Sequence, residues 1–309
     1  TREDDLQHDF YRPFGVHALA ATLDKKKNIT GWSHRCAATP RNYRETSMQN
    51  RPLYAACLEP DDFPAGLVAN LDKTFFSVAS GMPRGWWRAP IHTFHAFAVQ
   101  SFIDEVAVAS HQDAVNLRLS LLGEPRKILY SGHGGPTFDT GRLANVLKLC
   151  AARIGWGVPR NDGHGLGIAC HFTFGGYAAH AFEVSVEGSN LLIHRAICVV
   201  DVGRVVNPLG VEAQMMGGTI DAISAALNLA ITVKEGQVQQ HNLSDYPLLR
   251  MAQAPRTVEV HIVESNEEPS GAGEMGVPSA APALANAVYA ATTVRVRKLP
   301  LMPELKRML

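Results

Sequence analysis

The chain has 309 residues, of which 46% are hydrophobic and 19% charged, a balance typical of a folded protein with a core of one or two domains. Its 29 Lys and Arg residues match its 29 Asp and Glu residues, so binding of nucleic acid is not expected. No apolar run approaches the roughly 18 residues of a membrane span. The first residues show no signal peptide, and the five scattered cysteines predict free thiols rather than a zinc or iron–sulfur site.

The first segment of the chain predicts a β-hairpin. Apolar alternation between residues 14 and 40 flanks a Lys-rich turn at residues 25–28, which is typical of two paired strands. Residues 41–81 are rich in proline and polar groups. We expect mostly loop and short helix there.

Three helices are expected next. The first begins after Pro90, and its apolar residues recur at three- and four-residue steps. They form one mainly apolar stripe of Phe94, Phe97, Ala98, Ser101, Phe102, Glu105 and Val106. The second helix covers 114–122, between Asp113 as N-cap and Gly123 as stop signal. The third covers 140–154, with one apolar face.

The pattern becomes strand-like from residue 165. Residues 168–186 and 191–202 flank a turn signal at 187–190 and predict a long antiparallel hairpin. The remaining expected elements are a helix over 211–229, two short strands flanking Glu235-Gly236, a strand over 257–263, a glycine-rich loop over 270–276 and a helix over 279–291. Strand pairs alternating with helices predict an α+β fold with helices packed on antiparallel sheets.

The sharpest local motif is the glycine-rich loop Gly271-Ala272-Gly273-Glu274-Met275-Gly276. Glycines can adopt positive φ angles and leave the backbone bare. An acid in such a loop, just before a helix, could be held in a pocket with little solvent and act as a general base near neutral pH. The alternative is a glutamate that only complements the dipole of the following helix.

A second motif combines two tryptophans with two arginines. Trp86 and Trp87 lie between Arg84 and Arg88 in a loop bounded by glycine and proline. Such a loop can present an arginine to an anion while the indole rings wall off an apolar cavity. Alternatively, the rings plug an edge of the core.

A third motif connects a strand to a helix. Over residues 201–208 a strand ends and a turn follows. Gln214 is expected in or near the first turn of the next helix, and Gly217 and Gly218 come just after it. Small residues allow a bulky ligand to approach the backbone, and a helix N-terminus favours an anion. The alternative is a glycine pair that serves helix packing.

No metal site formed by protein side chains is expected. The 13 histidines are dispersed, and none forms a ligand spacing with a carboxylate. His92 and His95 could share a helix face, but no third ligand is evident. Nucleophile and phosphate-loop motifs are also missing from the sequence.

Taken in order, these motifs resemble the molybdenum-binding subunit of the xanthine dehydrogenase and aldehyde oxidase family, and in particular the branch of the isoquinoline 1-oxidoreductase beta subunit. The matching segments are 1–5, 8–13, 84–90, 201–208, 214–218, 245–247 and 271–282. The resemblance implies the C-terminal half of an α+β molybdopterin-binding subunit. One such region would cover 1–160 and a second 161–309.

The resemblance also implies roles for single residues. The metal would be held by the dithiolene sulfurs of a pterin cofactor, in plain or cytosine dinucleotide form. Glu274 matches the family's catalytic base, for a reaction whose added oxygen comes from water. The residues expected at the cofactor are Arg88, Gln214, Gly271, Ala272 and Gly273. Trp86 and Trp87 are hypothesised to wall the substrate funnel.

On this resemblance, the protein oxidises an aldehyde or hydroxylates an N-heteroaromatic ring. Electrons would pass to two-iron two-sulfur clusters on a small partner subunit, with a cytochrome as a further option. Two cofactor-binding stretches of the family are missing here and lie upstream in this branch, so a partner chain carrying the N-terminal half is expected. The branch is commonly exported, which predicts the periplasm. A non-catalytic assembly subunit and an unrelated α+β binding domain stay open as alternatives.

Overall fold

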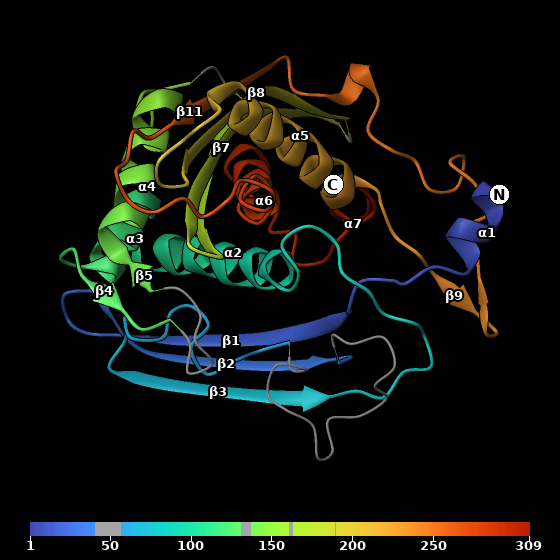
Figure 1. Cartoon of the computed structure of the whole chain (residues 1–309), viewed down its shortest axis with the longest axis horizontal. Coiled ribbons are helices and arrows are strands. Elements are labelled where there is room, and N and C mark those ends of the chain that lie inside the picture. Colours follow the sequence, from blue (N-terminus) through green and yellow to red (C-terminus); the bar gives the residue numbers. More distant parts are fainter. Residues whose placement is uncertain (41–56, 131–136, 161–162, 189) are drawn as a thin grey trace.

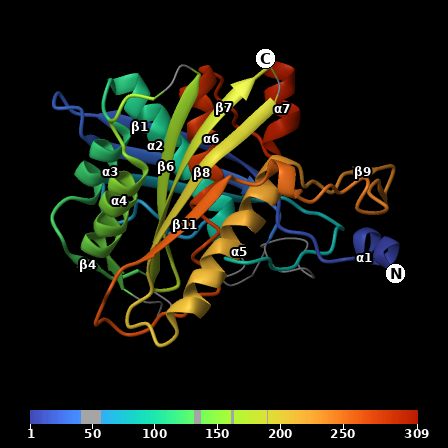
Figure 2. The same ribbon diagram turned by 90° about the horizontal axis from the view of Figure 1, so that it is seen from above.

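The computed structural model describes residues 1–40, 57–130, 137–160, 163–188 and 190–309. Two sheets lie on either side of a central helical layer (Figures 1 and 2). Among the described residues, no helix is both long enough and apolar enough to cross a membrane.

The first sheet has the order β1-β2-β3. β1 (Gly15–Leu23) and β2 (Ile29–Ala38) form the predicted antiparallel hairpin, and β3 (Asn70–Ser77) pairs in parallel with β2. The expectation of loop was therefore wrong for β3. This edge strand has polar residues at many positions, so no apolar run marks it in the sequence. Most of the predicted loop segment before it, residues 41–56, lies outside the described residues.

Three helices follow, close to their predicted bounds. α2 (His92–Ser110) lies between the first sheet and α6 (Ala280–Thr292) (Figure 1). α3 (Ala114–Leu122) is capped at its start by Asp113, whose side chain accepts hydrogen bonds from two backbone N–H groups. Gly123 caps its end, and both caps are as predicted. The predicted apolar face of α4 (Thr140–Ile154) is buried.

The apolar stripe of α2 has an unexpected environment. Most of its residues are only half-buried, while the helix buries a neighbouring face that includes Val99 and Ile103. The predicted stripe lines a large hollow instead. Apolar periodicity therefore marked a cavity wall rather than the core.

The second sheet has the order β11-β8-β7-β6. β6 (His164–Thr173), β7 (Gly176–Glu187) and β8 (Asn190–Asp201) are antiparallel, and β11 (Thr257–Ile262) pairs in parallel with β8. The predicted strand over 168–186 is thus two strands. They separate at Phe174 and Gly175, which both have positive φ angles and so turn the chain.

Helices cover both faces of this sheet. α4 packs on β7 and β8, whereas α5 (Pro208–Leu227) and α6 (Ala280–Thr292) pack on the opposite face. A Cβ on Gly167 would lie 2.0 Å from a backbone nitrogen of α6, so only glycine allows this close packing. The α+β prediction is confirmed, although two strands at sheet edges are parallel.

The predicted domain boundary at residue 160 lies between α4 and β6, and α4 packs directly on strands of the second region. That boundary stays a prediction. Short elements complete the fold: α1 (Arg2–Gln7), β4 (Lys127–Ile128), β5 (Phe138–Asp139), β9 (Val233–Lys234), β10 (Gln237–Val238), a 3₁₀ turn (Met251–Gln253) and α7 (Leu301–Met308). Of the helices, α1 and α7 were not predicted. α1 and β10 are in contact at one end of the molecule.

Candidate functional site

Four of the residues singled out in the sequence meet at one place, here called the Arg88 cluster: Arg88, Gln214, Gly273 and Glu274. Arg88 Nε donates to the carbonyl oxygen of Gly273 at 2.8 Å. Its Nη2 donates to the same carbonyl at 2.5 Å and to Gln214 Oε1 at 3.1 Å. One guanidinium therefore joins α5 to the glycine-rich loop.

Glu274 is half-buried, less enclosed than the sequence suggested. Its Oε2 accepts a hydrogen bond from the backbone N–H of Ala89. Ala89 and Ile91 have φ angles of 53° and 60°, which are strained for residues other than glycine. This backbone turns the N–H beside Arg88 toward the carboxylate. The sequence missed Ala89 because a backbone donor is not revealed by residue type.

Gln214 lies in the second turn of α5, not in or near the first as predicted. The helix begins earlier than expected, because Pro208 occupies its first turn and the Asn207 side chain caps it by accepting from the Gly210 N–H. The helix N-terminus therefore does not account for the position of Gln214. Its side-chain oxygen is fixed by Arg88 instead.

Glycines shape both sides of the cluster. A Cβ on Gly218 would lie 3.1 Å from Gly276, so α5 and the loop are in close contact there. In contrast, a Cβ on Gly217, Gly271 or Gly273 would meet no atom within 4 Å. The backbone at each of these three glycines borders open space.

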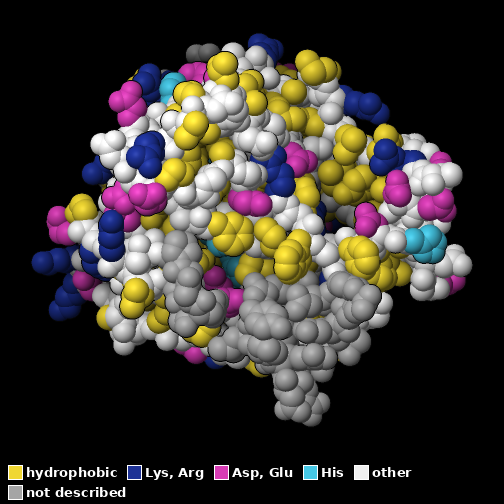
Figure 3. All heavy atoms as spheres, viewed as in Figure 1, with side chains coloured by type: hydrophobic (Ala, Val, Ile, Leu, Met, Phe, Trp, Pro, Cys, Tyr) yellow, Lys and Arg dark blue, Asp and Glu magenta, His cyan; other side chains and the backbone are white. Residues whose placement is uncertain are grey.

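A hollow of about 2110 Å³ extends along the neighbouring face. Its wall includes Trp86 and Trp87 from the arginine loop and Val277 from the segment after Glu274. Apolar side chains gather on this face of the molecule (Figure 3). Trp86 is 70% exposed, whereas Trp87 also packs against the core. Both tryptophans therefore lie where a funnel wall was expected, and that role stays a prediction.

Arg84 supports the loop and takes no part in the Arg88 cluster. It is buried, and its guanidinium donates to the carbonyl oxygens of Pro40 at 2.7 Å, Ser80 at 3.1 Å and Met82 at 2.6 Å. These bonds hold the base of the loop that carries Arg88. Of the two arginines in the motif, Arg88 alone belongs to the cluster.

A polar group that the sequence did not reveal lies inside the hollow. The Arg12 guanidinium is 4.7 Å from the centre of the Trp87 ring, a cation–π distance. Burial lowers the pKa of Arg12, and nearby Tyr246 and Asp221 oppose that shift. Burial raises the pKa of Asp221, which Arg88 and Arg12 oppose. Charged groups, Arg12 and Asp221 among them, thus interrupt the apolar wall of the hollow.

A buried histidine connects the elements behind the cluster. His180 on β7 lies 2.9 Å from Thr219 Oγ1 and 2.8 Å from Ser279 Oγ. Because Thr219 donates to the Met215 carbonyl, it accepts from His180 Nε2–H, and Ser279 donates to Nδ1. Burial lowers the pKa of His180 to about 3. This neutral network holds α5 and the start of α6 together.

The motif that begins at residue 201 is fixed by a buried ion pair. Arg142 on α4 contacts the carboxylate of Asp201 through two nitrogens, at 2.9 and 2.5 Å. The same carboxylate accepts a hydrogen bond from the Gly203 N–H at 3.0 Å. Asp201 therefore shapes the turn leading to α5 rather than facing a ligand.

Comparison with known proteins shows the family of the chain. Residues 154–255 match the model of a molybdopterin cofactor-binding domain. The chain is 29% identical, over its whole length, to the beta subunit of isoquinoline 1-oxidoreductase from Brevundimonas diminuta. It is 30% identical, over 71% of its length, to a subunit of nicotinate dehydrogenase from Pseudomonas putida. The chain belongs to the xanthine dehydrogenase family of molybdenum-binding subunits.

The family assignment agrees with the fold. Quinoline 2-oxidoreductase from Pseudomonas putida 86 superposes on the whole chain with a TM-score of 0.81 at 13% identity, over 63% of that structure. At such identity the likeness concerns the fold alone. This chain spans only part of its relatives: 38% of the length of the Brevundimonas protein and 19% of that of the nicotinate dehydrogenase chain.

Proposed function

We propose that the chain is part of a molybdenum hydroxylase that oxidises an aldehyde or hydroxylates an N-heteroaromatic ring with oxygen from water. The observation that carries the proposal is the meeting of Arg88, Gln214 and Glu274 beside bare glycine backbone. The names of relatives support both substrate classes: one belongs to an isoquinoline 1-oxidoreductase. Another, from Gluconacetobacter polyoxogenes, is a membrane-bound aldehyde dehydrogenase that is 26% identical over 98% of this chain and 41% of its own length.

The cluster fits a pterin-bound molybdenum cofactor. The open backbone of Gly217, Gly271 and Gly273 leaves room for a flat ring system, with Ala272 between the two loop glycines. Gln214 Oε1 accepts from Arg88, which leaves the amide Nε2 to donate to the ligand. The bound cofactor, in plain or cytosine dinucleotide form, supplies the two-electron chemistry.

The chain's own contribution is a positioned base. The Ala89 N–H holds one carboxylate oxygen of Glu274. Within the described residues, the Glu274 carboxylate accepts its hydrogen bond at Oε2. Oε1 can therefore accept the proton released when the oxygen of water is transferred to substrate. Trp86 and Trp87 would exclude water and orient a flat substrate in the hollow.

The test is elemental analysis of the native complex together with turnover of aldehydes and N-heterocycles. Close to one molybdenum per copy of the chain, with turnover of either substrate class, is the expected result. A complete complex without molybdenum, or a loaded complex inactive toward both classes, would contradict the proposal.

We further propose that a chain carrying the N-terminal half of the molybdenum subunit covers the hollow. The curated relatives are more than twice as long as this chain. Apolar side chains at the hollow are exposed, including Phe10 at 55%, Phe14 at 57% and Val16 at 72%, as expected for a surface that is buried in an assembly. The chain expressed alone should therefore be poorly soluble. A stable monomer would contradict this part.

The electron acceptor would be a small subunit with two-iron two-sulfur clusters, with a cytochrome as a further option, and the location would be the periplasm. These proposals rest on the family resemblance. Intact masses of every co-purifying chain, iron content and cell fractionation test them. A complex without iron, or one confined to the cytoplasm, would contradict them.

A further inference from the structure

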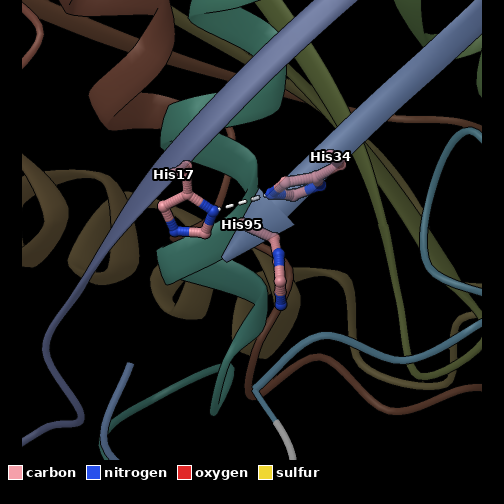
Figure 4. Close-up of side chains that lie close together, drawn as sticks. All are labelled: His17, His34 and His95. Carbon is pink, nitrogen blue, oxygen red and sulfur yellow. Dashed lines mark hydrogen bonds between the residues drawn. The ribbon is translucent and has the colours of Figure 1, made fainter. Parts of the chain in front are cut away.

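We propose that His17, His34 and His95 form a binding site for a divalent transition-metal ion, with zinc as the reference ion, separate from the Arg88 cluster. One ring nitrogen of each histidine lies within 4.8 Å of the others. His17 comes from β1, His34 from β2 and His95 from α2, which packs against this sheet (Figure 4). The sequence predicted no such metal, because the three ligands come from separate elements.

The sheet register places two of the histidines together. His17 pairs with Cys36, and His34 pairs with Leu19, so the two histidines are diagonal neighbours on one face of the hairpin. His17 Nδ1 lies 2.7 Å from His34 Nε2. Donors on one tetrahedral zinc would lie about 3.3 Å apart. Binding would therefore widen this pair, replace its hydrogen bond and draw the three ligand nitrogens closer than the 4.8 Å limit of the cluster.

The third histidine is held as metal ligands usually are. His95 Nε2 donates to the Cys57 carbonyl and lies 3.6 Å from an Asp62 carboxylate oxygen. Because Nε2 carries the proton, Nδ1 carries a lone pair. A carbonyl or carboxylate on the far nitrogen is the usual outer partner of a metal-bound histidine. Asp62 would also offset part of the metal's charge.

Buried nitrogens in the cluster have no partner. His34 is fully buried and His95 is 5% exposed. Within the described residues, His17 Nε2, His34 Nδ1 and His95 Nδ1 make no hydrogen bond. Of these three, His95 Nδ1 is the bare lone pair that would bind the ion. His17 Nε2 and His34 Nδ1 lie on the far side of the two facing nitrogens, and the ring that donates in this pair would carry its proton there once the ion binds. Such unpaired buried groups are rare and often mark a missing ion.

An ion can reach the cluster from solvent. His17 borders the hollow, which gives an ion a route inward. Neutral imidazole, the metal-binding state of histidine, is its ordinary form above a pKa of about 6.5.

The test measures zinc directly and does not depend on turnover. The native complex is stripped with a chelator, and zinc is then titrated against a competing chromogenic chelator. One zinc per chain is expected in addition to any molybdenum and iron. His17→Gln and His34→Gln should each weaken zinc binding at least about 100-fold, whereas the exposed His8→Gln should leave it unchanged.

A second readout covers the case in which His34→Gln fails to fold. Cobalt bound in place of zinc should give the absorption bands of tetrahedral nitrogen ligation in wild type and His8→Gln, and lose them in half-buried His17→Gln. Zinc should raise the thermal unfolding temperature of wild type and His8→Gln but not that of His17→Gln. Failure of wild type to bind zinc, or equal binding by His17→Gln, would overturn the proposal.

Discussion

The two sides of α2 carry similar apolar residues but face different surroundings. Val99 and Ile103 are buried and pack with the first sheet and α3. Phe94 and Phe97 lie on a neighbouring face of the same helix, where they line the hollow and remain half-buried. The same periodicity therefore serves a core on one side and a functional surface on the other. Polar groups differ in the same way. Glu274 is half-buried near the open glycine backbone, whereas Asp201 and His180 are enclosed in the protein.

The largest effect is expected at the open side. Glu274→Gln keeps the shape of the side chain and an acceptor for the Ala89 N–H, but it removes the base. Turnover in the complete complex should fall about 10²- to 10⁴-fold, with molybdenum content and unfolding temperature unchanged. Steady-state kinetics with elemental analysis gives the answer. Normal turnover would remove Glu274 from the reaction.

The second largest effect is expected on stability, for a substitution in the enclosed ion pair of Arg142 and Asp201. Arg142→Met leaves the buried carboxylate of Asp201 without its cation. Removing one partner of a buried ion pair costs about 3–5 kcal/mol, so the free energy of unfolding should fall by that amount in denaturant titrations. Arg297→Met, which removes an ion pair with a largely exposed arginine, is the matched control and should change little. Equal losses would show that burial does not distinguish the two pairs.

The two sides of α2 can be compared directly. Ile103→Ala should lower the free energy of unfolding by about 2–5 kcal/mol, because it opens a cavity in a closed core. Phe97→Ala removes a larger side chain from a half-buried position, yet it should cost less, since the hollow already gives that ring contact with solvent. Chemical denaturation of both variants ranks them. A greater loss for Phe97→Ala would mean that the hollow-facing side is part of the core.

The sequence predicted most of what local signals encode. Asp113 and Gly123 marked both ends of α3, and the Lys-rich turn marked the β1–β2 hairpin. Each depends on hydrogen bonds or φ angles within a few residues. β3 was missed because an edge strand needs no continuous apolar run. The stripe of α2 was found, but its surroundings depend on α5 and α6, which lie far away in the sequence.

The candidate site shows the same division. Arg88, Gln214 and Glu274 were identified through the order of weak motifs. The structure places Arg88 in contact with Gln214 and with Gly273, the neighbour of Glu274. The Ala89 N–H and the His17, His34 and His95 cluster were not identified. The first is a backbone group, and the second combines positions separated by 17 and 61 residues. Only tertiary packing makes such ligands neighbours.

The smallest expected effect concerns the enclosed His180. Its pKa is about 3 in the folded chain because of burial, below the roughly 6.5 of an unfolded histidine. The unfolded chain therefore binds a proton first as the pH falls, and stability is lost from about pH 6.5 down toward pH 3. One such group contributes up to about 1.4 kcal/mol per pH unit.

His180→Gln should be less stable at pH 7, because it loses the bond to Thr219 or to Ser279. Its unfolding free energy should nevertheless fall less steeply with acid than that of wild type, by about one proton. Identical slopes in urea titrations between pH 5 and 7 would show that His180 is not the enclosed, neutral group described above.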